Sequence, residues 1–191
     1  MTDPLAKLFG SSARVKLLRL FLFNPRLSFT VAEATNRARV ADDVARREVA
    51  QLLAAGVILR SGRSSGRYVL NNGFVYLDAL QNLLLNTRVR GDEVPKYLRT
   101  TGQLKLIILS GIFVNEWDGH LDLLLVGERV NDRKLRDRMR TLEAELGREL
   151  RYTLLATQDF LYRLNMSDKL IRDVLDYPHR IVVDKLNIGL K

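Results

Sequence analysis

The stretch ADDVARREVAQLLAAGVILRSGRSSGRYVL, residues 41–70, contains two different hydrophobic periods. In its first half, Ala45, Val49 and Leu52 recur at the spacing of one helical face. In its second half, two short apolar runs flank a turn of Gly, Ser and Arg residues, which is a hairpin signal. The stretch therefore predicts a helix over residues 41–55 that leads directly into two antiparallel strands.

Signals upstream predict two more helices and indicate where each begins. Ser11 and Ser12 are both candidate N-caps of a helix that an Asn-Pro pair ends. Thr30 is a candidate N-cap of a second helix, and Glu33 follows it at capping-box spacing. Gly56 is well placed to terminate the third helix. Three apolar residues share one face of the first helix: Val15, Leu18 and Leu22.

Charge is unevenly distributed along the 191 residues, which carry a net charge of +9. Residues 1–75 hold 12 Lys and Arg against 5 Asp and Glu, a net charge of +7 that leaves +2 for the rest. This asymmetry predicts a polyanion partner for residues 1–75, with a merely solvated basic surface as the alternative. Because the chain has no cysteine and two histidines, disulfides are excluded and no metal site is expected.

The residues FTVAEATNRARVADDVARREVAQLLAAGVILRSGRSSGRYVLN resemble the winged helix-turn-helix of arsenic-repressor-like transcription regulators. The resemblance implies that helix 41–55 enters the major groove and that the hairpin, or wing, contacts phosphates or the minor groove. It assigns six residues to DNA binding, three on the helix and three on the wing: Arg46, Arg47, Gln51, Arg60, Arg63 and Arg67. A helical hairpin domain for protein contacts is the alternative, and metal sensing lacks its ligands.

The segment NNGFVYLDALQNLLLNT follows the hairpin and predicts an amphipathic helix. Its apolar residues available for burial are Val75, Leu77, Leu80, Leu83 and Leu84. They fit either a core role or a homodimer interface, for which Leu80, Leu83 and Leu84 are the candidates. Polar residues with Gly and Pro then predict a linker that holds a short helix around residues 94–99.

The rest of the chain alternates strands with helices, which predicts a small α/β domain with a mixed sheet and an α+β protein as a whole. The expected strands are LKLIILSGIFV, LDLLLVGE, RYTLLATQ and HRIVVDK, and the expected helices are NDRKLRDRMRTLEAELGRE and DFLYRLNMSDKLIRDVLD. This order resembles the minimal nucleotidyltransferase fold. We therefore divide the chain into a winged-helix domain (1–75), a connecting helix and linker (76–100), and a nucleotidyltransferase-like domain (101–191).

The stretch SGIFVNEWDGHLDLLLVGE, residues 110–128, holds what the resemblance marks as a remnant nucleotide site. Active members have Gly-Ser after the first strand, two acids one residue apart on the second, and a third acid on a later strand. Here the pair reads Ser110-Gly111, His120 replaces the first acid and only Asp122 remains. Arg151 stands where the third acid is expected. With one carboxylate of three, the site is not expected to hold the magnesium ions that nucleotidyl transfer needs.

The sequence thus predicts a DNA-binding transcription regulator whose degenerate nucleotidyltransferase-like domain serves oligomerisation or ligand sensing. We expect duplex DNA as partner, a homodimer, no cofactor and no catalytic residue, and leave open a small-molecule or protein effector. The alternatives are a working nucleotidyltransferase and an antitoxin-like, partner-binding protein of the same group. No apolar run is long enough for a membrane span and no signal peptide is recognisable, so we expect a cytoplasmic protein.

Overall fold

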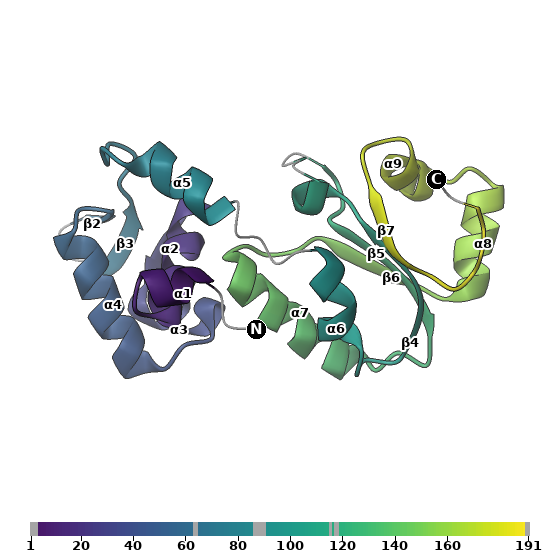
Figure 1. The fold of residues 1–191 in the computed structure, drawn as a ribbon, viewed down its shortest axis with the longest axis horizontal. Coiled ribbons are helices and arrows are strands. Elements are labelled where there is room, and N and C mark those ends of the chain that lie inside the picture. The colour runs from purple at the N-terminus through teal and green to yellow at the C-terminus, as the bar shows by residue number, and fades with distance from the viewer. Residues whose placement is uncertain (1–3, 63–64, 86–90, 115, 117–118, 190–191) are drawn as a thin grey trace. The chain divides into compact units, whose positions relative to one another are not determined.

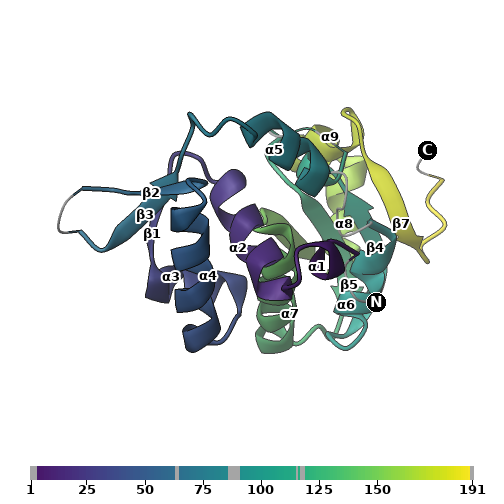
Figure 2. The same cartoon turned by 60° about the vertical axis from the view of Figure 1, so that its left-hand side comes forward.

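The computed structural model describes residues 4–62, 65–85, 91–114, 116 and 119–189. These residues form an α+β structure, as expected, and divide into two compact units (Figures 1 and 2). Unit 1 comprises Met1–Val89 and Arg140–Glu149, and unit 2 comprises Arg90–Met139 and Leu150–Lys191. Within the described ranges, no helix is both long enough and apolar enough to cross a membrane.

Unit 1 consists of helices and a small antiparallel sheet. Its elements are α1 (Pro4–Leu8), α2 (Ser12–Leu22), β1 (Ser28–Thr30), α3 (Val31–Ala38), α4 (Asp42–Ala54), β2 (Ile58–Arg60), β3 (Arg67–Leu70) and α5 (Leu77–Leu85). The strands lie in the order β1-β3-β2, and both pairings are antiparallel. The hairpin predicted after the third helix is therefore β2 and β3, and β1 joins its β3 edge.

Local signals set the helix boundaries in unit 1. The Ser11 hydroxyl accepts a hydrogen bond from the Arg14 N–H at 3.1 Å, so Ser11 is the N-cap of α2. Thr30 and Glu33 form the predicted capping box at the start of α3, with hydrogen bonds of 3.2 and 2.8 Å. Gly56 has φ +75° just beyond α4, a conformation that ends helices and favours glycine.

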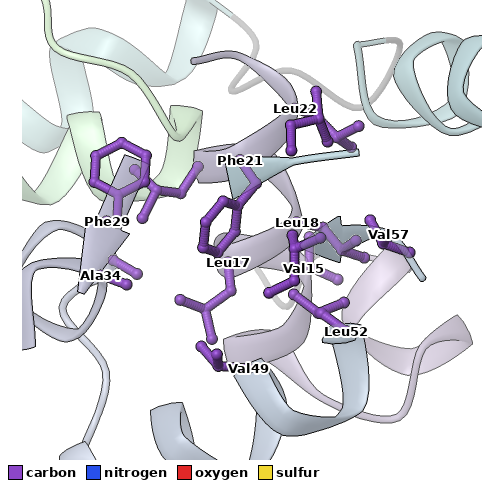
Figure 3. Packing of buried hydrophobic residues seen from close by; sticks show 14 of the residues in the cluster. Val15, Leu17, Leu18, Phe21, Leu22, Phe29, Ala34, Val49, Leu52 and Val57 are labelled. Carbon is purple, nitrogen blue, oxygen red and sulfur yellow. The ribbon is translucent and has the colours of Figure 1, made fainter. Parts of the chain in front are cut away.

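The core of unit 1 is built around α2. Figure 3 shows its apolar side chains between those of β1, α3 and α4. Phe21 meets Phe29 edge to face, with ring centroids 5.6 Å apart. The predicted inward residues are all buried: Val15, Leu18, Leu22, Ala45, Val49 and Leu52.

Helix α5 packs on this core with only part of its predicted face. Leu84 is buried, and Leu77 and Leu80 are half-buried against the core. Val75 and Leu83 are exposed instead, at 87% and 39%, so neither belongs to the core of unit 1 and their role in a dimer stays a prediction. Val75 lies before Leu77, the first residue of α5, so it is not part of the helix and does not share its buried face.

Unit 2 contains a mixed sheet, as predicted, and helices lie on both of its faces (Figure 1). Its elements are η1 (Gly91–Glu93), α6 (Val94–Leu98), β4 (Gln103–Leu109), η2 (Gly111–Val114), β5 (Leu123–Glu128), α7 (Asp132–Leu146), β6 (Tyr152–Leu155), α8 (Thr157–Asn165), α9 (Lys169–Leu175) and β7 (Arg180–Asp184). The strand order is β6-β5-β4-β7, in which only β5 and β6 run parallel among the described strands. Helices α8 and α9 pack on one face through Phe160, Ile171 and Val174, and α6 lies on the other (Figure 1).

Two expected elements of unit 2 are shorter in the structure. The strand LKLIILSGIFV ends at Leu109, because Gly111 adopts φ +52° and begins a 3-10 turn. The helix expected over DFLYRLNMSDKLIRDVLD is two helices, since Ser167 has φ +51° and cannot continue α8. The Asp168 carboxylate then accepts the Leu170 N–H at 3.0 Å and caps α9.

Helix α7 contributes residues to both units. Of the apolar residues at helical spacing in this helix, Leu135, Met139 and Leu142 are buried, whereas Leu146, also expected to be buried, is half-buried. From Arg140 onward the helix belongs to unit 1, and it ends at Leu146, directly before Gly147, which has φ +74°. This end of α7 contacts α2 closely: a Cβ added to Gly147 would lie 2.4 Å from the carbonyl carbon of Arg19.

Candidate functional site

The outward face of α4 carries the residues that the sequence assigns to DNA reading. Arg46, Arg47 and Gln51 are all exposed, and Ala50 lies among them. Small and polar side chains on one helical face allow the edge of a DNA groove to approach the backbone of the helix. Arg and Gln side chains carry hydrogen-bond donors suited to base edges. The structure thus brings the three predicted helix residues together on one solvent-facing surface.

Both arginines of this face are paired along the helix. Arg46 lies 2.8 Å from the Asp42 carboxylate and Arg47 lies 3.5 Å from Asp43, each at i,i+4 spacing. All four side chains are more than half exposed, and pairs of this kind contribute about 0.3–0.5 kcal/mol. A phosphate or a guanine edge can therefore displace the aspartates at little cost.

The hairpin distributes its predicted arginines differently. Arg60 is exposed at the end of β2. Arg67, on β3, is bound within unit 1: its Nη2 donates to the Ser28 carbonyl at 2.6 Å and lies 2.9 Å from the Glu33 carboxylate. Arg63 lies outside the described residues. Arg67 therefore joins β3 to β1 and to the start of α3, a role that its place in a basic turn did not indicate.

Glu33 is the residue on which these contacts converge. Its pKa lies below the usual value of 4.5, chiefly because the Thr30 backbone N–H donates to its carboxylate, with a further contribution from Arg67. The carboxylate is exposed, so its pairing with Arg67 is open to solvent. One acidic side chain thus serves both the capping box of α3 and the anchoring of the hairpin.

In unit 2, Asp122 is fully buried just before β5, and each of its carboxylate oxygens accepts two hydrogen bonds. Oδ1 accepts from the Ile112 N–H and from Arg151 Nη2, each at 3.1 Å. Oδ2 accepts from the Arg151 N–H at 2.9 Å and from Arg151 Nε at 3.1 Å. A carboxylate offers about four acceptor positions, so Asp122 is saturated by the chain itself.

The other residues of the remnant site pack around Asp122 or lie away from it. The Ser110 hydroxyl is buried and donates to the Leu121 carbonyl at 2.8 Å. Gly111 approaches so closely that an added Cβ would lie 2.2 Å from Asp122 Oδ1. His120, in contrast, is exposed. Three of the four predicted residues are therefore together in the interior.

Asp122 offers no free acceptor position to a metal ion, because its oxygens accept four hydrogen bonds from Ile112 and Arg151. In the part of the chain that the structure describes, no group of three or more His, Asp and Glu side chains is placed to hold an ion. Arg151 puts a guanidinium against the carboxylate that the resemblance assigns to magnesium. The charge of Asp122 is thus compensated internally.

Comparisons of the chain with protein-family models, curated proteins and solved structures find no match.

Sequence reasoning missed several polar contacts in unit 1 because their partners are far apart in the chain. The Arg14 Nε donates to the buried Glu48 carboxylate at 2.7 Å, which joins α2 to the inner side of α4. Lys16 pairs with Glu145 at 2.8 Å, and Asn24 donates to the Gly147 carbonyl at 2.7 Å. A charged residue on the inward face of α4 was the available signal, since buried carboxylates require partners.

Proposed function

We propose that the protein is a DNA-binding transcription regulator that places α4 in the major groove of duplex DNA. The observation that carries this proposal is the exposed set of Arg46, Arg47 and Gln51 on one helix face, directly before the hairpin. Arginine and glutamine recognise guanine and adenine edges through paired hydrogen bonds. Arg60, exposed on β2, adds a phosphate contact.

The order of elements in unit 1 supports the resemblance to arsenic-repressor-like winged helices. Helices α2, α3 and α4 precede the β2–β3 hairpin, and β1 completes a small antiparallel sheet. The net charge of +7 over residues 1–75 favours a polyanionic partner. Because Arg67 binds Ser28 and Glu33, we propose that it fixes the hairpin to β1 and α3. The contacts with DNA phosphates are then made by the other cations.

Unit 2 is, in this proposal, a nucleotidyltransferase-like domain without transfer activity that serves oligomerisation or effector binding. Its mixed sheet supports the likeness in fold. The saturation of Asp122 by Arg151 and Ile112 weighs against the alternative of a working nucleotidyltransferase. The antitoxin-like alternative makes a different prediction, namely a tight protein partner in place of a DNA site.

We further propose that the protein is a homodimer that uses the exposed apolar residues near the start of α5 and on its free face. Val75, Tyr76 and Leu83 are exposed at 87%, 67% and 39%. Leu84, an earlier interface candidate, is buried within unit 1, and Leu80 packs on that core. Sedimentation of the full chain at micromolar concentration tests this, with Leu83→Lys expected to shift the dimer toward the monomer. A wild-type monomer overturns the dimer.

The test of DNA binding uses the full chain and fluorescence anisotropy on random duplexes over a series of salt concentrations. The logarithm of affinity should fall linearly with the logarithm of salt, by about 0.9 for each phosphate contacted. Arg60→Ala should weaken binding to every sequence and reduce that slope by about 1. Arg172→Ala, an exposed arginine of α9, is the matched control. Salt-insensitive binding, or equal effects of the two variants, would show that the proposed interface is wrong.

A further inference from the structure

Unit 2 contains a hollow of about 530 Å³ between α6 and two neighbouring strands of its sheet, the inner strand β4 and the edge strand β7. Lys105 and Ile107 of β4 both line the hollow. Val183 of β7 is the strand partner of Ile107 in β4. The Lys185 N–H donates to the Lys105 carbonyl at 2.7 Å. Together with Gln103 and Leu104 at the start of β4, these four residues form the sheet side of the hollow.

Helix α6 and the turn after it form the opposite side. The lining from this part of the chain consists of Pro95, Leu98, Arg99 and Gly102. Pro95, Leu98 and Leu104 give the hollow an apolar surface that continues onto Ile107 and Val183. Its volume lies within the range of roughly 300–1,000 Å³ that is usual for small-molecule sites.

The charged residues of the hollow are all cations. Lys105, Lys185 and Arg99 line it, and no carboxylate is among the described residues that do so. Lys105 Nζ lies 4.0 Å from Glu128 Oε1, a distant pairing with an oxygen that also accepts the Thr157 N–H at 3.1 Å. Lys185 follows the last residue of β7 and its N–H donates to the Lys105 carbonyl, so the lining of the hollow holds like charges that repel one another. A bound anion would relieve this repulsion.

We propose that the hollow binds a small amphipathic anion, with a carboxylate or phosphate head between Lys105, Lys185 and Arg99 and an apolar chain against Leu98 and Val183. A cationic ligand would be repelled by the three cations. A fully polar anion would make no contact with the apolar lining. This inference concerns unit 2 alone and does not depend on DNA binding, so either can fail without the other.

The experiment is isothermal titration of the full chain with octanoate, octyl phosphate, octyltrimethylammonium and inorganic phosphate. At least one of the two amphipathic anions should bind more tightly than inorganic phosphate, and the octyl cation should not bind. The anion that binds better identifies the head group. Amide NMR spectra should place the shifts at residues 103–107 and at Val183. Equal binding of the octyl cation or of inorganic phosphate, or shifts elsewhere, overturns the proposal.

Charge variants provide the second arm. Lys185→Gln and Arg99→Gln should each weaken binding of the preferred anion by about tenfold, the usual effect of one charge-assisted contact. Lys169→Gln removes an exposed cation from α9, outside the hollow, and should leave the affinity unchanged. Thermal unfolding of each variant shows whether the domain remains folded. Affinity that survives both hollow variants, or falls equally in Lys169→Gln, overturns the proposal.

Discussion

Arg151 binds the carboxylate of Asp122 with three of its own nitrogen atoms, the backbone N, Nε and Nη2, at 2.9, 3.1 and 3.1 Å. Asp122 has no exposed surface, whereas the Arg151 side chain is 39% exposed. The buried negative charge is therefore compensated by a residue that reaches it from the surface. In the nucleotidyltransferases that the chain resembles, a metal ion compensates the charge of the corresponding carboxylate.

Removing the guanidinium should destabilise unit 2. Arg151→Ala leaves the buried Asp122 carboxylate with backbone donors only, and we expect the free energy of unfolding to fall by about 3 kcal/mol. Urea denaturation measures the change. The control is Arg172→Ala, which removes an exposed pair with Asp176 and should cost at most about 0.5 kcal/mol. Similar losses in the two variants would mean that the buried pair does not stabilise the fold.

Magnesium and ATP should not bind tightly, and no nucleotide should be transferred. Magnesium prefers carboxylate oxygens with free acceptor capacity, and Asp122 has none left. Calorimetry with ATP, with and without magnesium, measures the binding, and an assay for label transfer measures the reaction. Micromolar, magnesium-dependent affinity that disappears in Asp122→Asn would restore the enzyme alternative.

Residues of α4 should determine which DNA sequence is preferred. Gln51→Ala or Arg46→Ala should reduce discrimination at individual base pairs by about 1–3 kcal/mol for each good base contact. The measurement is competition binding between a selected site and its single-base variants. Arg60→Ala, which removes a proposed phosphate contact, should lower affinity for all of these sequences alike. If both α4 variants discriminate between DNA sequences as the wild type does, α4 does not recognise the bases.

Gly147 should tolerate no side chain. Gly147→Ala combines a left-handed conformation with a Cβ only 2.4 Å from the Arg19 carbonyl carbon, and should cost at least about 2 kcal/mol. Gly10 is the matched control in unit 1, since its φ is +69° but no atom lies within 4 Å of an added Cβ. Thermal unfolding measures the loss of stability in both variants. The loss in Gly10→Ala reports the left-handed backbone conformation alone, and the additional loss in Gly147→Ala reports the steric contact with Arg19. An equal loss in Gly10→Ala would assign the whole effect to strain.

The capping box should lose its contribution in acid. The pKa of Glu33 is lowered in the folded state, first by the Thr30 N–H and then by Arg67, so the ionised form stabilises the fold. The contribution is present above the unfolded value of 4.5 and is lost as pH falls through the lower folded value. Wild type should therefore exceed Glu33→Gln in stability at pH 7, and the difference should shrink below pH 4.5. A constant difference would contradict this.

Much of the fold could be predicted because its signals are local. The Thr30–Glu33 capping box, the Ser11 cap and the period of α4 each depend on residues within a few positions. The break between α8 and α9 was missed because the apolar period continues across it, although Asp168 is itself a capping signal.

The polar contacts were predictable in part only. Pairing of Asp122 with a nearby arginine follows from the need to compensate a buried carboxylate, but its partner Arg151 lies 29 positions away. The engagement of Arg67 with Ser28 depends on strand order, which the pattern of a single hairpin does not contain. Contacts between distant segments are set by packing, and local periodicity does not encode them.

The division of α7 between the units has a consequence for synthesis on the ribosome. Chains emerge from the N-terminus, and N-terminal domains usually fold first. Here the Lys16–Glu145 and Asn24–Gly147 contacts of unit 1 form only after the strands β4 and β5 have been made. The first segment to emerge therefore reaches its final packing late, and any fragment that stops near residue 90 lacks a layer of its own domain. The two units are interleaved in the chain and are completed together.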